Sequence, residues 1–307
     1  MDKASATQGR RRKNKVAEDG LSPNGHQSLQ DGQTLWGGVV HGIPWELHRG
    51  DAQAVLSTVP ADRFACVVTS PPYYSQRDYM VAGQIGLEKT FKEYVLRLVN
   101  TFSEVKRVLA PDGTLFLNLG DTYYSGKGQP KGTDRKNGAR RWLGVRPVDA
   151  SGLGVPRKTA LGIPWRVALA MIDDGWTLRS AITWVRASSI PEPTAHDRPW
   201  RTYEMIFLFA KSPRYYFSRG GLDKQEDVWH ISKRPRNSHG VHSAAFPDEI
   251  VEKCLSVGCP PKGEVLDPFA GSGTVLRVAL HSKRPAFGID LSHKFCDHMS
   301  RTLTSAK

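Results

Sequence analysis

The sequence predicts an α/β fold in which helices cover both faces of a mostly parallel, twisted sheet. Short, continuously apolar runs of strand length alternate along the chain with longer stretches whose apolar residues recur at helical spacing. A helix between two such runs is the connection that joins parallel strands, and parallel strands are buried on both faces. With 307 residues, the chain is long enough for one large domain or two small ones.

The clearest strand–helix–strand unit begins with the apolar run FACVVT at residues 64–69, which predicts a buried strand. Residues 91–109 predict a helix, because their apolar side chains fall on one face at helical spacing. A turn at Pro111–Gly113 and a second buried strand at Thr114–Leu119 complete the unit.

A second series of elements begins after residue 160. Pro164 stands where proline suits the first turn of a helix. The elements predicted from this part of the sequence are a helix at 163–172, strands at 178–185 and 203–210, a helix at 246–255, a strand at 264–266, a helix at 274–281 and a strand at 286–289.

Charge and cysteine content limit the class of protein. The chain has 43 Lys and Arg against 30 Asp and Glu, a net charge of +13, which favours a polyanionic partner such as nucleic acid. Part of this excess lies in the basic run Arg10–Lys15, but the rest of the chain is also basic. No apolar stretch has the length of a membrane span or of a signal peptide. The four cysteines lack the paired spacing of a zinc site, and Cys66 is expected to be a buried free thiol, so a cytoplasmic location is predicted.

The segment Thr69-Ser70-Pro71-Pro72-Tyr73 is the most informative stretch of the chain. Two consecutive prolines cannot donate backbone hydrogen bonds and fix their own φ, so the strand must end there in a rigid corner. A hydroxyl before the corner and an aromatic ring after it suit a grip on a flat polar ring by its edge and its face. A strand-ending turn with a buried tyrosine is an equally simple interpretation of these residues alone.

A second motif, Asp267-Pro-Phe-Ala-Gly-Ser-Gly-Thr274, lies between a predicted strand and a predicted helix. Its glycines let the backbone approach a ligand closely at the N-terminus of the helix. Asp290 ends the next strand, where an acidic residue is placed to bind ribose hydroxyls. The motif lacks the third glycine of GxGxxG and the lysine of a P-loop. A nucleoside that bears an amino-acid tail therefore suits it better than a pyrophosphate.

The two motifs together closely resemble the S-adenosylmethionine-dependent DNA amino-methyltransferases, over roughly residues 45–290. The proline-containing box precedes the glycine-rich box, the order of the circularly permuted β group. Lesser matches are Gly50-Asp51, residues 107–113, Trp184, Tyr203-Glu204 and Phe246-Pro247. The Thr-Ser-Pro-Pro-Tyr box resembles that of the cytosine-N4 members, since adenine-N6 members usually have Asp in place of the serine. The chain has no Pro-Cys dipeptide of the cytosine-C5 enzymes.

The resemblance implies a Rossmann-like methyltransferase fold, S-adenosyl-L-methionine as cofactor, no metal, and a cytosine flipped out of double-stranded DNA as substrate. Ser70 Oγ and the Pro71 carbonyl would accept hydrogen bonds from the exocyclic amine, beside Pro72, and Tyr73 would stack on the base. The cofactor residues it implies are Phe269, Gly271 and Gly273 in the turn, Asp267 near the methionine amino group, Asp290 at the ribose and Asp51 near the adenine. From the residues alone, Asp267 is also explained as a charge partner of a helix N-terminus and Asp51 as a turn former.

The expected organisation has five parts: a disordered basic tail (1–33), a catalytic half (34–124), a mobile basic loop (125–160), a part with further strands (161–245) and a cofactor-binding half (246–307). The fourth part contains the candidate recognition segments 186–200 and 230–242. A solvated insertion without a role is the alternative for the loop. For the activity, the alternatives are an adenine-N6 methyltransferase, a catalytically inactive DNA-binding protein, and an enzyme that methylates RNA or a protein glutamine. A cognate restriction endonuclease or a defence-system partner fits the family, and the oligomeric state is not predicted.

Overall fold

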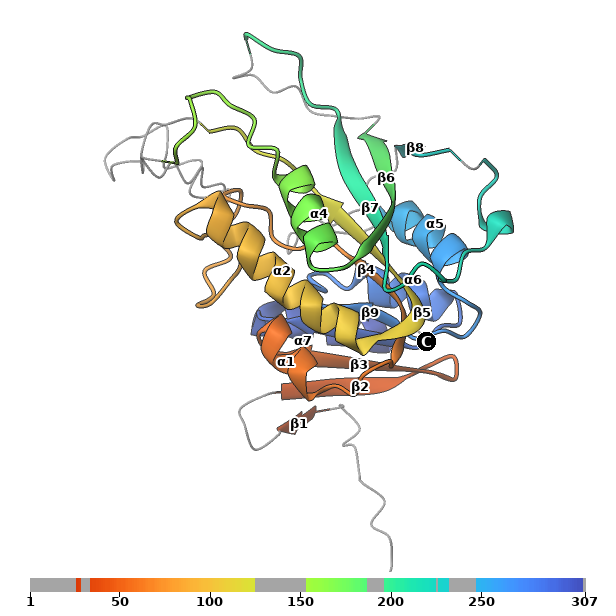
Figure 1. Cartoon of the computed structure of the whole chain (residues 1–307). Coiled ribbons are helices and arrows are strands. Elements are labelled where there is room, and N and C mark those ends of the chain that lie inside the picture. Colours follow the sequence, from red (N-terminus) through yellow and green to blue (C-terminus); the bar gives the residue numbers. More distant parts are fainter. Residues whose placement is uncertain are drawn as a thin grey trace, which may run out of the picture.

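The computed structural model describes residues 26–28, 34–124, 153–186, 196–224, 226–231 and 247–305. These residues form one ten-stranded sheet with helices packed on both faces (Figure 1). Its five central strands run parallel, in the order β3, β10, β9, β4, β5. Their bounds are Ile43–Arg49 (β3), Ala286–Asp290 (β10), Val265–Asp267 (β9), Phe64–Thr69 (β4) and Leu109–Leu119 (β5).

Further strands extend both edges of this parallel centre. On the β3 side, β2 (Thr34–Val40) and β1 (His26–Ser28) add antiparallel pairs. On the β5 side, β7 (Tyr203–Ala210) and β6 (Thr177–Arg186) are antiparallel, and β8 (Val228–Ile231) runs parallel to β6. The observed sheet confirms the predicted α/β fold, with a mostly parallel centre.

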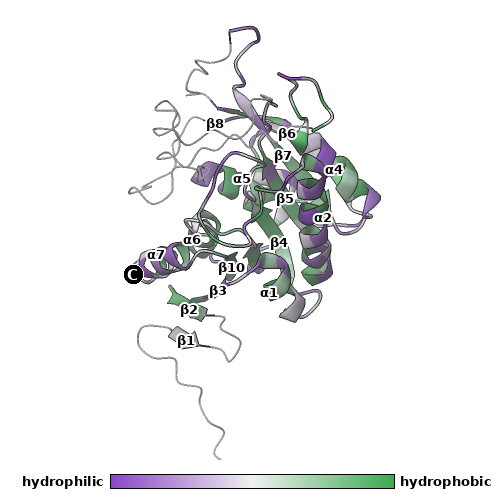
Figure 2. Ribbon diagram, turned by 90° about the vertical axis from the view of Figure 1, so that its left-hand side faces the viewer, coloured by the Kyte–Doolittle hydropathy of each residue, from purple (hydrophilic) through white to green (hydrophobic). Residues whose placement is uncertain are grey.

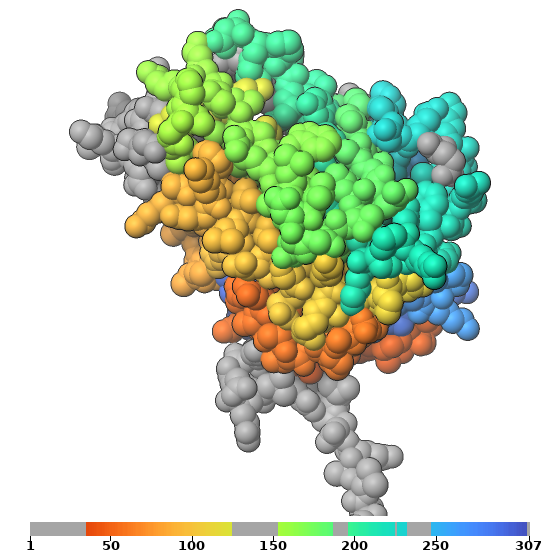
Figure 3. Space-filling view, in the orientation of Figure 1, coloured from red at the N-terminus to blue at the C-terminus, as the bar shows by residue number. Residues whose placement is uncertain are grey.

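The helices divide into two groups on opposite sides of the sheet, as Figure 2 shows. The helices of each group share one hydrophobic core with the face of the sheet that they cover, and α2 belongs to one group while α5 and α6 belong to the other. The first group is α1 (Ala52–Thr58), α2 (Phe91–Val108) and α4 (Ile163–Asp173). The second group is α5 (Asp248–Gly258), α6 (Thr274–His281) and α7 (His293–Ser305). A 3₁₀ turn, η1 (Arg219–Gly221), lies beside α5. On the face with the first group, α2 and α4 form a continuous surface (Figure 3).

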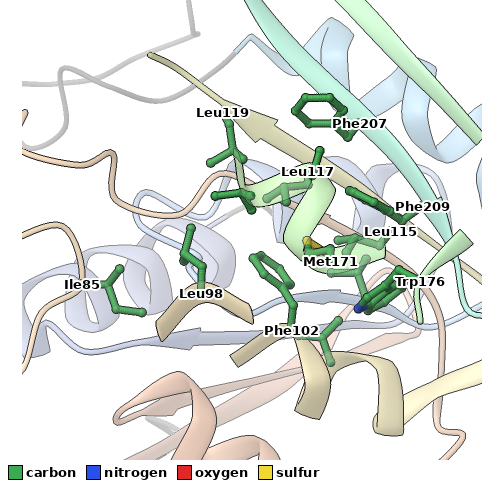
Figure 4. Packing of buried hydrophobic residues seen from close by; sticks show 14 of the residues in the cluster. Ile85, Leu98, Phe102, Leu115, Leu117, Leu119, Met171, Trp176, Phe207 and Phe209 are labelled. Atoms are coloured by element: carbon green, nitrogen blue, oxygen red, sulfur yellow. The ribbon is translucent and has the colours of Figure 1, made fainter. Parts of the chain in front are cut away.

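The continuous apolar runs of the sequence are explained by burial on both faces of the sheet. In β4, Cys66 and Val68 belong to the core under α5 and α6, while Val67 belongs to the core under α2. In β5, Phe116 and Leu117 face opposite cores in the same way. Figure 4 shows the second of these cores, where residues of α2 and α4 meet those of β5 and β7.

Helix α2 shows how local sequence fixes an element. Thr90 accepts a hydrogen bond from the Glu93 backbone N–H, and the Glu93 side chain accepts one from the Thr90 N–H, a capping box. The buried face of the helix consists of Phe91, Tyr94, Leu98, Thr101, Phe102, Val105 and Val108, at the spacing that the sequence predicts.

Several predicted elements have the bounds that the sequence indicates, and others differ. Strands 64–69 and 203–210 and helix 274–281 are observed with the predicted bounds. The predicted turn at 111–113 does not separate a helix from a strand, because β5 already begins at Leu109. The pairing of β5 with β4 is nevertheless interrupted between Leu109 and Thr114. The α5 helix begins at Asp248, two residues later than predicted, since Pro247 is its N-cap.

Other predictions fall on residues beyond the described part of the chain. Of the predicted disordered tail 1–33, only His26–Ser28 is described, and it is strand β1 rather than disordered. The loop 125–160 is described from residue 153 onward, and the recognition segments 186–200 and 230–242 only at 186, 196–200 and 230–231. All four cysteines are free and buried. In the described residues, no helix combines the length and apolarity that a membrane crossing needs.

Candidate active site at the carboxyl edge of the sheet

The strand order brings both sequence motifs to one edge of the sheet. Strand β4 lies between β9 and β5. Cys66 of β4 pairs with Val265 of β9, although about two hundred residues separate the two strands in the sequence. The carboxyl ends of β4, β9, β10 and β3 therefore lie side by side, and Ser70, Asp267 and Asp290 follow or end them. Ligands of open α/β sheets bind at this edge.

Two pockets adjoin at this edge. The first has about 670 Å³ of space, partly open to solvent, and the second about 1120 Å³. The first is lined by the turns after β3, β9 and β10 and by a segment that includes Tyr79 and Ile85. The second is lined by Pro71, Tyr73, Asn118, Trp184, Glu204 and Asp267, among others. Four residues line both pockets: Ser70, Tyr79, Phe269 and Gly271.

Asp290 joins two turns of the first pocket. Its Oδ2 accepts the Gly271 N–H at 2.8 Å, and its Oδ1 accepts the Ser292 N–H at 2.7 Å. Each carboxylate oxygen has a second lone pair, so both remain able to accept from a ligand hydroxyl. Burial raises the pKa of this carboxyl from 3.8 to about 6.

Asp267 joins the two motifs to each other. Its Oδ1 accepts the Thr69 hydroxyl at 2.7 Å and the Phe269 N–H at 3.0 Å. The residue is 3 % exposed, and this burial raises its pKa from 3.8 to about 7 against the effect of the two hydrogen bonds. Asp267 also lines the second pocket, as Gly271 and Ser272 do.

The glycine-rich turn uses its two glycines differently. Gly271 has φ +52° and lines both pockets, with its N–H bound to Asp290. Gly273 has φ +79°, and a Cβ there would lie 2.5 Å from Cγ of Met299, so packing against α7 demands glycine. Gly273 is absent from the walls of both pockets, so its contact with a cofactor stays a prediction. Phe269 packs edge-on against Phe102, with the ring centroids 6.4 Å apart.

Asp51 lines the first pocket and is also the N-cap of α1. Its Oδ1 accepts the Ala54 N–H at 3.1 Å, and Oδ2 lies 3.8 Å from a guanidinium nitrogen of Arg97. The turn-forming role that the residue type suggests and the predicted place in the pocket are therefore compatible.

The Ser70–Tyr73 corner is held from two sides. The Tyr94 hydroxyl of α2 donates to the Pro72 carbonyl at 2.9 Å. The Tyr73 ring packs against Gly120, where a Cβ would lie 2.5 Å from Cε2. The Tyr73 hydroxyl lies 2.6 Å from Glu204 Oε2 and 3.0 Å from Asn118 Oδ1, and Ser70 Oγ lies 3.3 Å from it. Burial, together with Glu204, raises the pKa of this phenol well above 10.0, so it is neutral.

The structure adds pocket residues that the sequence did not single out as functional, among them Asn118 and Tyr79, which line the second pocket. Arg186, from the predicted recognition segment 186–200, and Glu204, from one of the lesser motif matches, line the same pocket, and Glu204 binds Tyr73. Asn118 is a buried polar residue between two buried leucines, Leu117 and Leu119, which is a signal that the sequence offers. Trp184 is 7 % exposed, as expected of a core aromatic, and also lines the second pocket.

The described parts of the basic segments contact one another and the end of the segment after β5. The Arg198 guanidinium lies over the Tyr123 ring, 3.7 Å from its centroid, and Lys158 forms an ion pair with Asp197. These contacts connect the segment that follows β5 with residues 196–200.

This fold, with a glycine-rich turn and an acidic strand end beside a second pocket, suits a methyltransferase. The chain belongs to the DNA methylase family, whose model matches residues 64–301. It is 43 % identical over 258 residues to the type II methyltransferase M.XycI of Xanthomonas campestris pv. cyanopsidis, covering 81 % of this chain and 84 % of that one. It is 42 % identical over 260 residues to the type II methyltransferase M.Cfr9I of Citrobacter freundii, covering 82 % and 85 %.

Solved structures support the same fold. The cytosine-N4-specific PvuII DNA methyltransferase superposes with a TM-score of 0.64 at 21 % identity, covering 85 % of this chain and 90 % of that one. A putative DNA modification methylase from Thermus thermophilus, solved in complex with S-adenosyl-L-methionine, gives 0.59 at 22 % identity, with 85 % and 95 % covered. The chain is thus a DNA methyltransferase that uses S-adenosyl-L-methionine, as the sequence predicts.

Proposed function

We propose that this protein is a site-specific DNA methyltransferase that methylates the exocyclic N4 amine of a cytosine flipped out of double-stranded DNA. The position of Ser70 on the walls of both pockets is the observation that supports this most directly. With the adenosine part of the methyl donor in the first pocket and its methionine part reaching Asp267 on the wall of the second, the methyl group would meet a base in the second pocket at this residue. Tyr79, Phe269 and Gly271 form the rest of the boundary.

The residues of the two pockets fit S-adenosyl-L-methionine. The first pocket has apolar walls, including Ile85 and Phe295, for an adenine ring, with Asp51 at one side. Asp290 has free lone pairs for the ribose hydroxyls, as worked out above. The buried Asp267 suits the amino group of the methionine part, because a cation there stabilises its ionised form. The cofactor supplies an activated methyl group on a sulfonium.

On the base side, the corner residues position the amine. The lone pair of the cytosine amine is delocalised into the ring, so the amine is a poor nucleophile. Hydrogen bonds from the amine to Ser70 Oγ and the Pro71 carbonyl favour a pyramidal nitrogen whose lone pair points toward the boundary of the pockets. Tyr73 contributes an aromatic wall, and fixed positions of this kind supply much of the rate. Removal of the base from the duplex costs a few kcal/mol.

The serine in this corner favours cytosine over adenine in our proposal, in keeping with the Ser-Pro-Pro-Tyr box described above. The PvuII enzyme, which has the same fold, is a cytosine-N4-specific methyltransferase. The order of the two boxes supports membership of the β group. The relatives are type II methyltransferases, so we propose a cognate restriction endonuclease as a partner and a cytoplasmic location. We also propose the five-part organisation given above, except that residues 26–28 of the tail belong to the sheet.

The proposal is tested by offering the purified protein and labelled S-adenosyl-L-methionine to duplex DNA, to RNA and to protein in parallel. We expect label in DNA alone and, after digestion to nucleosides, in N4-methylcytosine. Ser70→Ala serves as the control for a contaminating activity. Label only in N6-methyladenine would replace cytosine by adenine as the target. Absence of label and of cofactor binding, even with DNA present, would favour an inactive DNA-binding protein.

A further inference from the structure

A line of oxygen atoms runs from Ser70 into the wall of the second pocket. Ser70 Oγ donates to the Tyr73 hydroxyl at 3.3 Å, and the Tyr73 hydroxyl lies 2.6 Å from Glu204 Oε2. The three residues come from the end of β4 and the start of β7, on strands separated in the sheet by β5. The methyl transfer proposed above uses the Tyr73 ring but neither its hydroxyl nor the Glu204 carboxylate, so a role for these two groups has to be found elsewhere in the reaction.

The proton positions in this line follow from the donors available. The Tyr73 hydroxyl has one proton, and its two close acceptors are Glu204 Oε2 at 2.6 Å and Asn118 Oδ1 at 3.0 Å. Asn118 Nδ2 donates to the Met205 carbonyl at 3.1 Å, which turns its oxygen toward Tyr73. An amide oxygen can accept a hydrogen bond but is a very weak base, whereas a carboxylate takes up a proton readily. Glu204 is therefore the proton acceptor at the end of the line.

The carboxylate is held in place from the neighbouring strand. The other oxygen of Glu204, Oε1, lies 3.3 Å from Nη1 of Arg186 on β6. Nη2 of Arg186 donates to the Arg201 carbonyl at 2.8 Å, so this guanidinium is itself fixed. The Glu204 side chain is 14 % exposed, enough to exchange a proton with solvent through the second pocket. Because the Tyr73 phenol is neutral, it can accept a proton at oxygen while it donates its own.

We propose that Ser70, Tyr73 and Glu204 form a proton relay that removes the proton released by the methylated amine; this inference rests on the proposed function. When the amine nitrogen bonds to the methyl carbon, the nitrogen becomes positively charged and holds one proton too many. That proton passes to Ser70 Oγ as the serine proton passes to Tyr73, and the tyrosine proton passes to Glu204 Oε2. Each hydroxyl ends with one proton, the amine ends neutral, and Glu204 ends protonated.

The long first step is consistent with this role. An O–H···O bond is usually 2.5–3.0 Å, so 3.3 Å between Ser70 and Tyr73 is long. Catalytic hydrogen bonds are often long in the absence of substrate and shorten in the complex. A base amine bound at Ser70 fixes the serine rotor in the direction of Tyr73.

The relay is tested with Tyr73→Phe, Glu204→Gln and the double variant. Tyr74→Phe is the matched control, because Tyr74 is the neighbouring buried tyrosine and its hydroxyl has no hydrogen-bond partner among the described residues. We expect each relay variant to lower the single-turnover methylation rate by roughly 100-fold. The double variant should be no slower than the slower single variant. Cofactor and DNA affinities should stay within about twofold of wild type, which also shows that the variants fold.

Chemical rescue distinguishes proton uptake from packing. In Glu204→Ala, added formate should enter the second pocket and restore part of the rate. Formate should not help Tyr73→Phe, because the relay is then broken before the carboxylate. Wild-type-like rates in both single variants, additive losses in the double variant, or no rescue by formate would overturn the relay while the wild type still methylates DNA. If the wild type makes no methylated base, the proposed function itself fails.

Discussion

Asp267→Asn should make the cofactor-free protein more stable and its cofactor binding weaker. The carboxyl is buried and its pKa is raised from 3.8 to about 7, so the folded state binds this proton more tightly than the unfolded chain does. Stability is therefore lost as the pH rises from 3.8, where the unfolded chain ionises, and the loss is complete above about pH 7. A difference of about three units at about 1.4 kcal/mol each gives an upper limit of about 4 kcal/mol.

Asparagine removes this penalty without loss of the hydrogen bonds. Both donors, the Thr69 hydroxyl and the Phe269 N–H, are bound by Oδ1, which an asparagine oxygen replaces. We expect Asp267→Asn to gain about 2–4 kcal/mol at pH 8 and close to nothing at pH 4, with the gain growing between these values.

The assay is thermal unfolding of the cofactor-free protein at pH 4, 5, 6, 7 and 8, for wild type and Asp267→Asn side by side. The gain at pH 8 corresponds to a melting temperature about 5–10 °C higher than that of wild type. Calorimetry at pH 8 should show cofactor affinity reduced by at least about tenfold. A stability difference that does not change with pH would refute the assignment of a buried, strained carboxyl. Unchanged cofactor affinity would refute its contact with the methionine part.

Three further predictions follow from the site. Ser70→Ala should lower turnover by at least about tenfold with cofactor affinity nearly unchanged, whereas Asp290→Ala should mainly weaken cofactor binding. Kinetics and calorimetry on both variants check this, and equal losses of cofactor affinity would contradict the division of roles. Wild-type affinity for the cofactor should rise from pH 5 to pH 8. Asp267 ionises near pH 7, and only its carboxylate attracts the amino group; Asp290 ionises near pH 6, and its carboxylate accepts the ribose hydroxyls more strongly than the protonated form does. A titration profile that is flat would be inconsistent with either contact. Gly273→Ala should lower stability by roughly 1–3 kcal/mol because its φ of +79° and the Met299 contact exclude a Cβ; denaturant unfolding measures this, and a neutral change would show that α7 can shift.

The sequence predicted those helices and strands whose pattern of apolar residues matches the side chains that the fold buries. In residues 64–119, helix α2 buries the face that its spacing indicates, and β4 is apolar because both of its faces are covered. Helix α7 was missed because only Cys296, Met299 and Leu303 of it are buried, which leaves a largely polar sequence. The four-residue strand β8 is too short to show a pattern, and its existence depends on pairing with β6.

Some residues of the candidate site could likewise be predicted from local sequence, and others could not. Ser70, Asp267 and Asp290 could be predicted because each stands in or beside a motif at the end of an apolar strand. Asn118 and Glu204 reach the same pocket only through the order of strands in the sheet, which places β5 beside β4 and β7 beside β5. Local sequence does not determine that order. The packing role of Gly273 depends likewise on Met299, which is distant in the sequence.

The measurement that tests the central claim most directly uses S-adenosyl-L-methionine with a deuterated methyl group. Duplex DNA is treated with the purified protein, digested to nucleosides and analysed by mass spectrometry, so that only methyl groups transferred in the reaction carry deuterium. We predict deuterated N4-methylcytosine in the wild-type reaction and little or none with Ser70→Ala. Deuterium only in N6-methyladenine, or equal amounts of N4-methylcytosine from wild type and Ser70→Ala, would contradict the proposed target and the role of Ser70.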